Sequence, residues 1–358
     1  MGRVKTGKTG PVVTYAVPKV LLMDMGEDVR DVVRATGFDV STGSFGTPYR
    51  VPIHDGFVRL VYNHDLPKDF AERDIVVVDT EPADVLDRAG DAPPVAPGED
   101  GWWASCGWGM VDPRPKVMAI FADQCNKMLA HGSIFVVFAH PRQSQSLHWG
   151  HNSYGHLSSG SSMVRAHDNW AFLPIFGAQE HLQVTSEEGE EIHVEDGDGV
   201  LSNLLRRHMK GADYDCTLHP LYYLRGVWEP LTTNRYNAPV AAAVAPRTEQ
   251  GGWVFLFPAV PDRGRFIVDL LEDVLPNLAP RLFPHAEGQR WVERSEYELP
   301  QVLDLRRRIQ RIQEDARAQV AALEAEIEGW RADLGYLHDL LRGTGDALVK
   351  AVEGMAGL

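Results

Sequence analysis

A run of apolar residues near the middle of the chain constrains the fold most. Gly132-Ser-Ile-Phe-Val-Val-Phe-Ala-His-Pro-Arg142 has no polar residue between Ser133 and His140 and ends at a proline-containing turn. Such a run predicts a strand that is buried on both faces, as in a parallel sheet. Because ligands bind beyond the carboxyl ends of strands in open α/β sheets, we expect His140 and Arg142 to lie at a binding site.

Strand-like and helix-like segments alternate on both sides of this run. Residues 74–79 are a second continuous β-branched run, and Asp79 and Glu81 stand at its end. The alternation predicts an α/β fold, with a mainly parallel, flavodoxin-like sheet flanked by helices. We expect Asp79, Glu81, His140 and Arg142 to be the ligand-binding residues, although Arg142 has the alternative of an ion pair with Asp79 or Glu81. The other predicted strands are 20–23, 38–42, 239–244 and 252–257, and the other predicted helices are 27–36, 116–131, 200–210 and 265–275.

Two long segments interrupt this alternation, at about residues 88–115 and 143–200, and we interpret them as insertions. The first holds Trp102, Trp103 and Trp108, which either stack a base or sugar or cover the edge of a core. The second ends in an acidic stretch, residues 187–198, that favours a solvated hairpin.

The order of these segments resembles the class I glutamine amidotransferase-like superfamily, and its ThuA-like branch in particular. The resemblance rests on residues 132–140, Pro239-Val-Ala-Ala-Ala-Val and Gly252-Trp-Val-Phe-Leu-Phe-Pro258, and it spans residues 18 to about 285. It implies a G-x-C-x-G nucleophile where this chain has Phe138-Ala-His140-Pro-Arg142. Without that thiol we expect no glutamine hydrolysis, and no catalytic residue is assigned. Cys106 is expected to be a packing thiol.

A histidine-rich stretch supports an alternative. His148, His151 and His156 stand close together in a predicted glycine-rich loop, where three imidazoles are able to bind zinc. A metal-dependent hydrolase at the carboxyl edge of the sheet is therefore the second function to consider, and zinc is the one cofactor it implies. The competing interpretation is an ordered loop without a ligand.

The C-terminal region carries a heptad pattern. From Val302 to Leu341 apolar residues recur three and four apart, with one stutter near Ala316. This pattern predicts a long coiled-coil helix and a homodimer. The contact positions that we assign to the coil are Leu305, Ile309, Ile312, Val320, Leu323, Ile327, Trp330, Leu334, Leu337 and Leu341.

We thus expect four parts in the chain: a flexible tail (1–17), the amidotransferase-like domain (18–298), the coiled coil (299–342) and a short terminal helix (343–358). Residues from 297 onward also resemble uncharacterised multidomain bacterial proteins, in which a coil and a turn like Thr344-Gly345 lead into a restriction-endonuclease-like domain. That resemblance implies a nuclease or ATPase partner, as in an antiphage defence complex.

The composition limits the function further. The 358 residues include 50 acidic and 35 basic side chains, a net charge of -15 that opposes non-specific binding of nucleic acid. The number and spacing of the three cysteines indicate that the thiols are reduced. The sequence has no run of about 18 apolar residues, so we predict no membrane span. We therefore expect a cytoplasmic, non-catalytic scaffold that binds a ligand or partner and oligomerises or docks through its coil.

Overall fold

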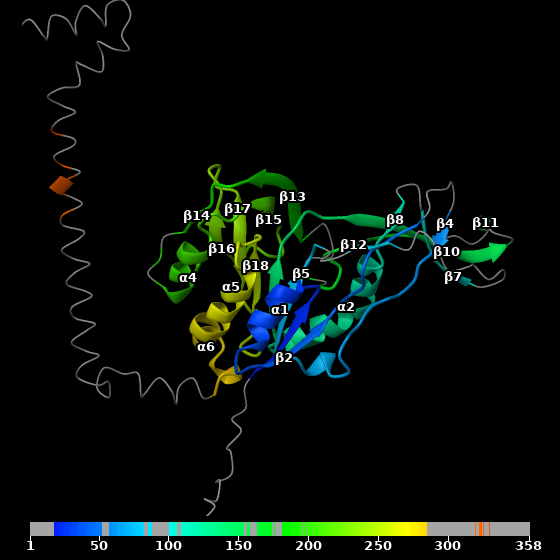
Figure 1. The fold of residues 1–358 in the computed structure, drawn as a ribbon, viewed down its shortest axis with the longest axis horizontal. Helices are drawn as coiled ribbons and strands as arrows, with labels where there is room; N and C mark the ends of the chain where they lie inside the picture. Colours follow the sequence, from blue (N-terminus) through cyan, green and yellow to red (C-terminus); the bar gives the residue numbers. More distant parts are fainter. Residues whose placement is uncertain are drawn as a thin grey trace, which may run out of the picture. The chain divides into compact units, whose positions relative to one another are not determined.

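The fold is seen in a computed structural model (Figure 1). It describes residues 18–51, 57–81, 85–87, 100–105, 109–153, 156–157, 163–173, 175, 181–195, 197, 199–284, 319, 322–323, 325 and 329. The chain divides into two compact units, residues 1–286 and 287–358. All the strands and helices below belong to the first unit.

The first unit is organised around an eight-stranded sheet with the strand order β14-β16-β17-β18-β9-β5-β1-β2. Neighbouring strands from β18 through β9, β5 and β1 to β2 are parallel, whereas the pairs β18–β17, β17–β16 and β16–β14 are antiparallel. The α/β class predicted from the sequence is confirmed. The strands are β1 (Lys19–Met23), β2 (Asp39–Gly43), β5 (Ile75–Asp79), β9 (Ile134–Phe138), β14 (His193–Val194), β16 (Trp228–Thr233), β17 (Pro239–Val244) and β18 (Val254–Phe257).

Apolar side chains leave both faces of this sheet, because neighbouring residues in a strand point to opposite sides. Val20 and Leu22 belong to one core, together with residues of α1 (Glu27–Arg34), α4 (Val200–His208) and α5 (Arg263–Asp269). Leu21 and Met23 belong to the other core, together with α2 (Arg114–Ala130). Helices therefore cover both faces, as Figure 1 shows.

Helices α1 and α5 pack closely on the same face. A Cβ atom added to Gly264 would lie 2.9 Å from the Cβ atom of Val32, so this contact requires glycine. The chain continues from α5 through a π-helical turn (Leu270–Val274), α6 (Leu275–Leu278) and a 3₁₀ turn (Pro280–Leu282). Another 3₁₀ turn (Phe70–Glu72) precedes β5.

Strands from the two predicted insertions pair with each other. Strand β7 (Asp100–Ser105) lies between β4 (Phe57–Arg59) and β10 (Ser144–Ser153), and β10 also pairs with β11 (His156–Leu157) and β12 (Met163–Asp168). A smaller sheet joins β3 (Tyr49–Arg50), β6 (Leu86–Asp87) and β8 (Met110–Val111). The hairpin predicted for residues 187–198 is wrong, because β13 (Leu182–Gly189) pairs with β15 (Tyr214–Pro220) and β14 pairs with β16.

The predicted coil lies almost wholly outside the described residues. In the unit 287–358 the structure describes Gln319, Ala322, Leu323, Ala325 and Gly329, which are helical. The heptad dimer therefore stays a prediction, as does the flexible tail at residues 1–17. No helix in the described part of the chain is long and apolar enough to cross a membrane.

Candidate functional site

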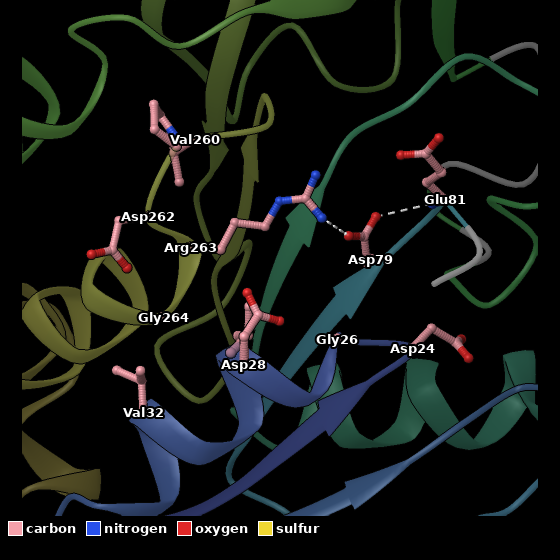
Figure 2. Close-up of a pocket in the computed structure, with 12 residues that line it drawn as sticks. Asp24, Gly26, Asp28, Val32, Asp79, Glu81, Val260, Asp262, Arg263 and Gly264 are labelled. Atoms are coloured by element: carbon pink, nitrogen blue, oxygen red, sulfur yellow. Dashed lines mark hydrogen bonds and ion pairs between the residues drawn. The ribbon is translucent and has the colours of Figure 1, made fainter. Parts of the chain in front are cut away.

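A cavity lies at the carboxyl edge of the parallel strands (Figure 2). From β1 the chain turns to β2 on one side, whereas β5, β9 and β18 lie on the other, so the strand order reverses between β1 and β5. This is the place where open α/β sheets bind ligands. The cavity has a volume of about 830 Å³ and is lined by Asp24, Gly26, Asp28, Val29, Val32, Asp79, Glu81, Val260, Pro261, Asp262, Arg263 and Gly264.

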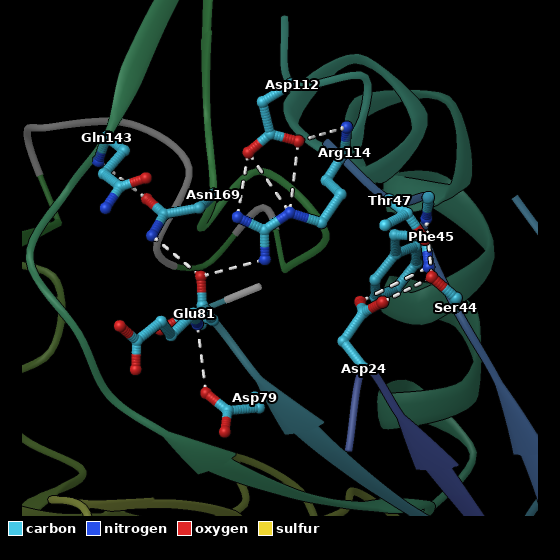
Figure 3. Close-up of polar contacts among 12 residues, drawn as sticks. Asp24, Ser44, Phe45, Thr47, Asp79, Glu81, Asp112, Arg114, Gln143 and Asn169 are labelled. Atoms are coloured by element: carbon cyan, nitrogen blue, oxygen red, sulfur yellow. Dashed lines mark hydrogen bonds and ion pairs between the residues drawn. The ribbon is translucent and has the colours of Figure 1, made fainter. Parts of the chain in front are cut away.

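Asp24, directly after β1, is held in an unusual state. Its backbone is left-handed, with a φ of 57°, a conformation that costs energy for a residue with a Cβ atom. Its side chain accepts hydrogen bonds from the Ser44 hydroxyl at 2.5 Å and from the Phe45 N–H at 3.3 Å (Figure 3). Burial raises the pKa of Asp24 to about 6, although the Ser44 hydrogen bond and the Arg114 charge oppose that rise. A buried carboxylate in a strained backbone is a feature of functional sites.

Asp79 ends β5 and forms the centre of the charged wall. Its side chain is buried and accepts a hydrogen bond from the Glu81 N–H at 3.0 Å. Asp79 also forms an ion pair with Arg263, the first residue of α5 (Figure 2). The Arg263 guanidinium lies 5.5 Å from the centre of the Phe138 ring. One cation therefore faces several carboxylates in this cavity.

His140 follows β9 and connects two parts of the fold. Its Nδ1 lies 2.5 Å from Asp215 Oδ2 of β15, and its Nε2 lies 3.3 Å from Asp79 Oδ1 and 3.7 Å from Glu81 Oε2. Burial lowers the pKa of His140, but the hydrogen bond with Asp215 and the negative charges of Asp79 and Asp215 outweigh burial and raise that pKa to about 9. The two flanking carboxylates thus favour the protonated imidazole at neutral pH, a form that does not accept a further proton.

A buried arginine supports the turn after β5 (Figure 3). Arg114, with none of its surface exposed, pairs with Asp112 at 2.8 Å and donates to the Thr80 carbonyl at 3.3 Å. Asn169 donates to the same carbonyl at 3.2 Å and to the Pro141 carbonyl at 3.1 Å. The Thr80 hydroxyl accepts the His140 N–H at 2.9 Å. These contacts hold the turns that follow β5 and β9 against each other.

The structure brings together three of the four predicted ligand-binding residues. Asp79, Glu81 and His140 form one group, and the first two line the cavity. Arg142 instead forms an ion pair with Asp168 at 2.8 Å and donates to the Leu182 carbonyl at 3.1 Å. The expected alternative, a pair with Asp79 or Glu81, is therefore wrong.

Asp24, Asp215 and Arg263 were missed by the sequence analysis. The position of Asp24 could have indicated a site residue, because Asp24 directly follows the predicted strand 20–23. Asp79 stands in the same way at the end of the predicted strand 74–79. Asp215 and Arg263 had no such signal, because they meet His140 and Asp79 only through the tertiary fold.

The prediction that the histidine-rich stretch forms a loop is wrong. His148 and His151 belong to strand β10, and His156 belongs to β11, its antiparallel partner. The side chains of His151 and His156 lie outside the described ones. Within the described part of the chain no group of three or more His, Cys, Asp or Glu side chains is arranged to hold a metal ion. A zinc site at His148, His151 and His156 stays a prediction.

The cysteines that the structure describes lack the environment of a reactive thiol. Cys125 and Cys216 are buried and form no disulfide. Burial raises the pKa of Cys125 to about 12, and it also raises the pKa of Cys216 above its usual range. A thiol with such a pKa is a poor nucleophile. Cys106 lies outside the described residues.

Comparison with known proteins adds no assignment. No protein-family model matches the chain, and no curated protein matches it. The amidotransferase-like resemblance and the bacterial multidomain resemblance both stay predictions.

Proposed function

We propose that the α/β body binds a small polar ligand in the cavity between β1 and β5, without covalent catalysis, and that the C-terminal coil joins such bodies or docks them in a larger assembly. The observation that carries the proposal is the cavity itself, which has several carboxylates and one guanidinium on its walls. Its volume of about 830 Å³ is in the range of small-molecule sites.

The charges favour one class of ligand. Asp24, Asp28, Asp79 and Glu81 present oxygen acceptors, whereas Arg263 is the one cation among the described lining residues. Carboxylates accept hydrogen bonds from hydroxyl and ammonium groups, and charge-assisted bonds of this kind are the strong ones. We infer that the ligand carries several hydroxyl or amino groups, as a sugar, a polyol or a polyamine does.

The state of His140 argues against this residue as the base of a hydrolysis, although Asp24, whose pKa burial raises to about 6, lines the same cavity. A hydrolase that activates water needs a base close to neutral pKa or a metal ion. His140 is protonated at neutral pH because two carboxylates flank it. Its role in the proposal is to fix the positions of Asp79 and Asp215, not to move a proton.

The ligand site is tested at Asp28. We expect spermidine, glucose or glycerol, used as representatives of the three ligand classes, to raise the midpoint of thermal unfolding of the full chain. Asp28→Asn removes one exposed charge from the cavity wall and should weaken that binding about tenfold, since a hydrogen bond to a charged group contributes roughly 1.5–3 kcal/mol. Glu27→Gln changes the neighbouring residue, which does not line the cavity, and should have no effect. Equal losses in both variants would contradict the site.

The coil is tested by truncation. Light scattering should give a dimer for the full chain and a monomer for residues 1–298, because the truncation removes every heptad position from Leu305 to Leu341. An unchanged subunit number after truncation would refute the coil as the contact. We propose that a nuclease or ATPase partner binds to the same coil. Such a partner should bind the full chain but not residues 1–298.

A further inference from the structure

Three basic side chains gather on a surface that the proposed site does not use. Arg165 and His167 lie two residues apart on β12, so they point to the same face of the strand. Lys116 comes from the first turn of α2, which lies against β12 (Figure 1). Strand β10 is paired with β12, and its Gln145 lies opposite His167. We call Lys116, Arg165, His167, Gln145 and their aromatic neighbours the basic-aromatic face.

The positive charge on this face is not balanced by described acidic groups. Neither Lys116 nor Arg165 forms an ion pair with any residue that the structure describes. Burial and the Arg165 charge lower the pKa of Lys116, and burial together with the Lys116 and Arg165 charges lowers the pKa of His167. Asp168 acts in the opposite direction on His167, but it is already paired with Arg142. A bound anion would relieve this repulsion.

Two indole rings stand beside the cations. The Lys116 ammonium lies 4.0 Å from the centre of the Trp102 ring. Trp149 is opposite Trp102 across strands β10 and β7, with ring centres 5.3 Å apart at an angle of 65°. The His167 ring centre lies 6.1 Å from that of Trp102. Trp102 and Trp149 are only partly buried, so aromatic surface remains available next to the charges.

Polar atoms on the face lack partners. His167 Nε2 and Gln145 Oε1 are buried and have no hydrogen-bond partner among the described residues. Gln145 also lines a neighbouring cavity of about 360 Å³, together with Asp112 and Pro115, whereas the three basic side chains lie outside that lining. Because buried polar groups are almost always hydrogen-bonded, these two atoms point to a ligand with polar groups of its own.

We propose that the basic-aromatic face binds a nucleotide, with its phosphates on Lys116, Arg165 and His167 and its base against Trp102 and Trp149. Cations near phosphate and aromatic rings near a base are the two kinds of contact by which proteins hold nucleotides without a glycine-rich loop. The net charge of -15 opposes a long polyanion, so a free mononucleotide fits better than a nucleic acid. This site is separate from the cavity between β1 and β5, and neither proposal depends on the other.

Calorimetry with ATP on the full chain tests the proposal. Magnesium is left out so that it does not neutralise the negative charge of the phosphates. We expect one binding event whose affinity falls as salt is added. Lys116→Ala and Arg165→Ala should each weaken it about tenfold, as expected for the loss of one charge-assisted contact. Lys127→Ala, three turns along α2 from Lys116, and Arg225→Ala, in the turn between β15 and β16, are matched controls because both side chains are exposed and neither belongs to the face, and they should leave the affinity unchanged.

Four results would overturn the proposal. The absence of binding heat, or equal ATP affinity in Arg165→Ala and the wild type, would show that the face holds no nucleotide. Inorganic triphosphate that binds as tightly as ATP would show that the rings contribute nothing and that the site takes a bare anion. A ten-residue single-stranded oligonucleotide that binds at least tenfold more tightly than ATP would identify a polymer as the ligand. Arg165 is exposed, so its replacement tests binding without a risk to folding.

Discussion

Replacement of Arg114 by methionine should lower the free energy of unfolding by about 3–5 kcal/mol, the cost of removing one partner from a buried ion pair. Arg114 has no exposed surface, and its guanidinium pairs with Asp112 and donates to the Thr80 carbonyl. Methionine fills much of the same space but leaves the Asp112 carboxylate uncompensated. The penalty therefore comes from a charge that is stranded in the protein, and not from a lost packing contact.

Urea unfolding followed by tryptophan fluorescence measures this loss. Arg206→Met is the matched control, because Arg206 is exposed and its one hydrogen bond with a described residue goes to Asn203, so its replacement should change the stability by less than about 0.5 kcal/mol. Adding Asp112→Asn to Arg114→Met should restore part of the stability, since the stranded charge is then gone. A loss below about 1 kcal/mol in Arg114→Met would show that water or rearrangement compensates the pair.

The same network explains what the sequence could and could not predict. The runs at 74–79 and 132–138 are local signals, and both became central strands of the sheet. Parallel strands end at one edge, so the meeting of Asp79 with His140 followed from the strand prediction. In contrast, Asp215 lies 75 residues from His140, and Arg263 lies 184 residues from Asp79. No local pattern brings such residues together.

The histidine-rich stretch shows how long-range pairing overrides composition. Glycine and serine around His148 favour a loop when the segment is considered alone. Strand β10 nevertheless forms, because β7 and β12 supply partners on both sides of it. The acidic stretch at 187–198 was misassigned for the same reason, since β13 and β14 each pair with a strand more than 20 residues away. Local propensity therefore did not determine the secondary structure of either segment.

His140→Gln should make the protein less stable by about 3 kcal/mol at pH 6, and this difference should disappear by about pH 10. The pKa of His140 is raised from 6.5 to about 9, and each pKa unit corresponds to about 1.4 kcal/mol of preference for the protonated form. A raised pKa stabilises the fold fully below the unfolded value of 6.5, and the stabilisation is lost as the pH rises through 9. Glutamine retains a hydrogen-bonding group but carries no charge between Asp215 and Asp79.

Unfolding curves for wild type and variant at pH 6, 8 and 10 give the difference directly, and groups that titrate equally in both proteins cancel. His131→Gln is the control, since His131 is exposed and contacts no acidic group among the described ion pairs, so its curves should follow the wild type at every pH. If His140→Gln also ran parallel to the wild type, His140 would be neutral in the folded protein. A neutral imidazole beside Asp215 is a possible general base, and in that case the argument against hydrolysis at this edge of the sheet would fail.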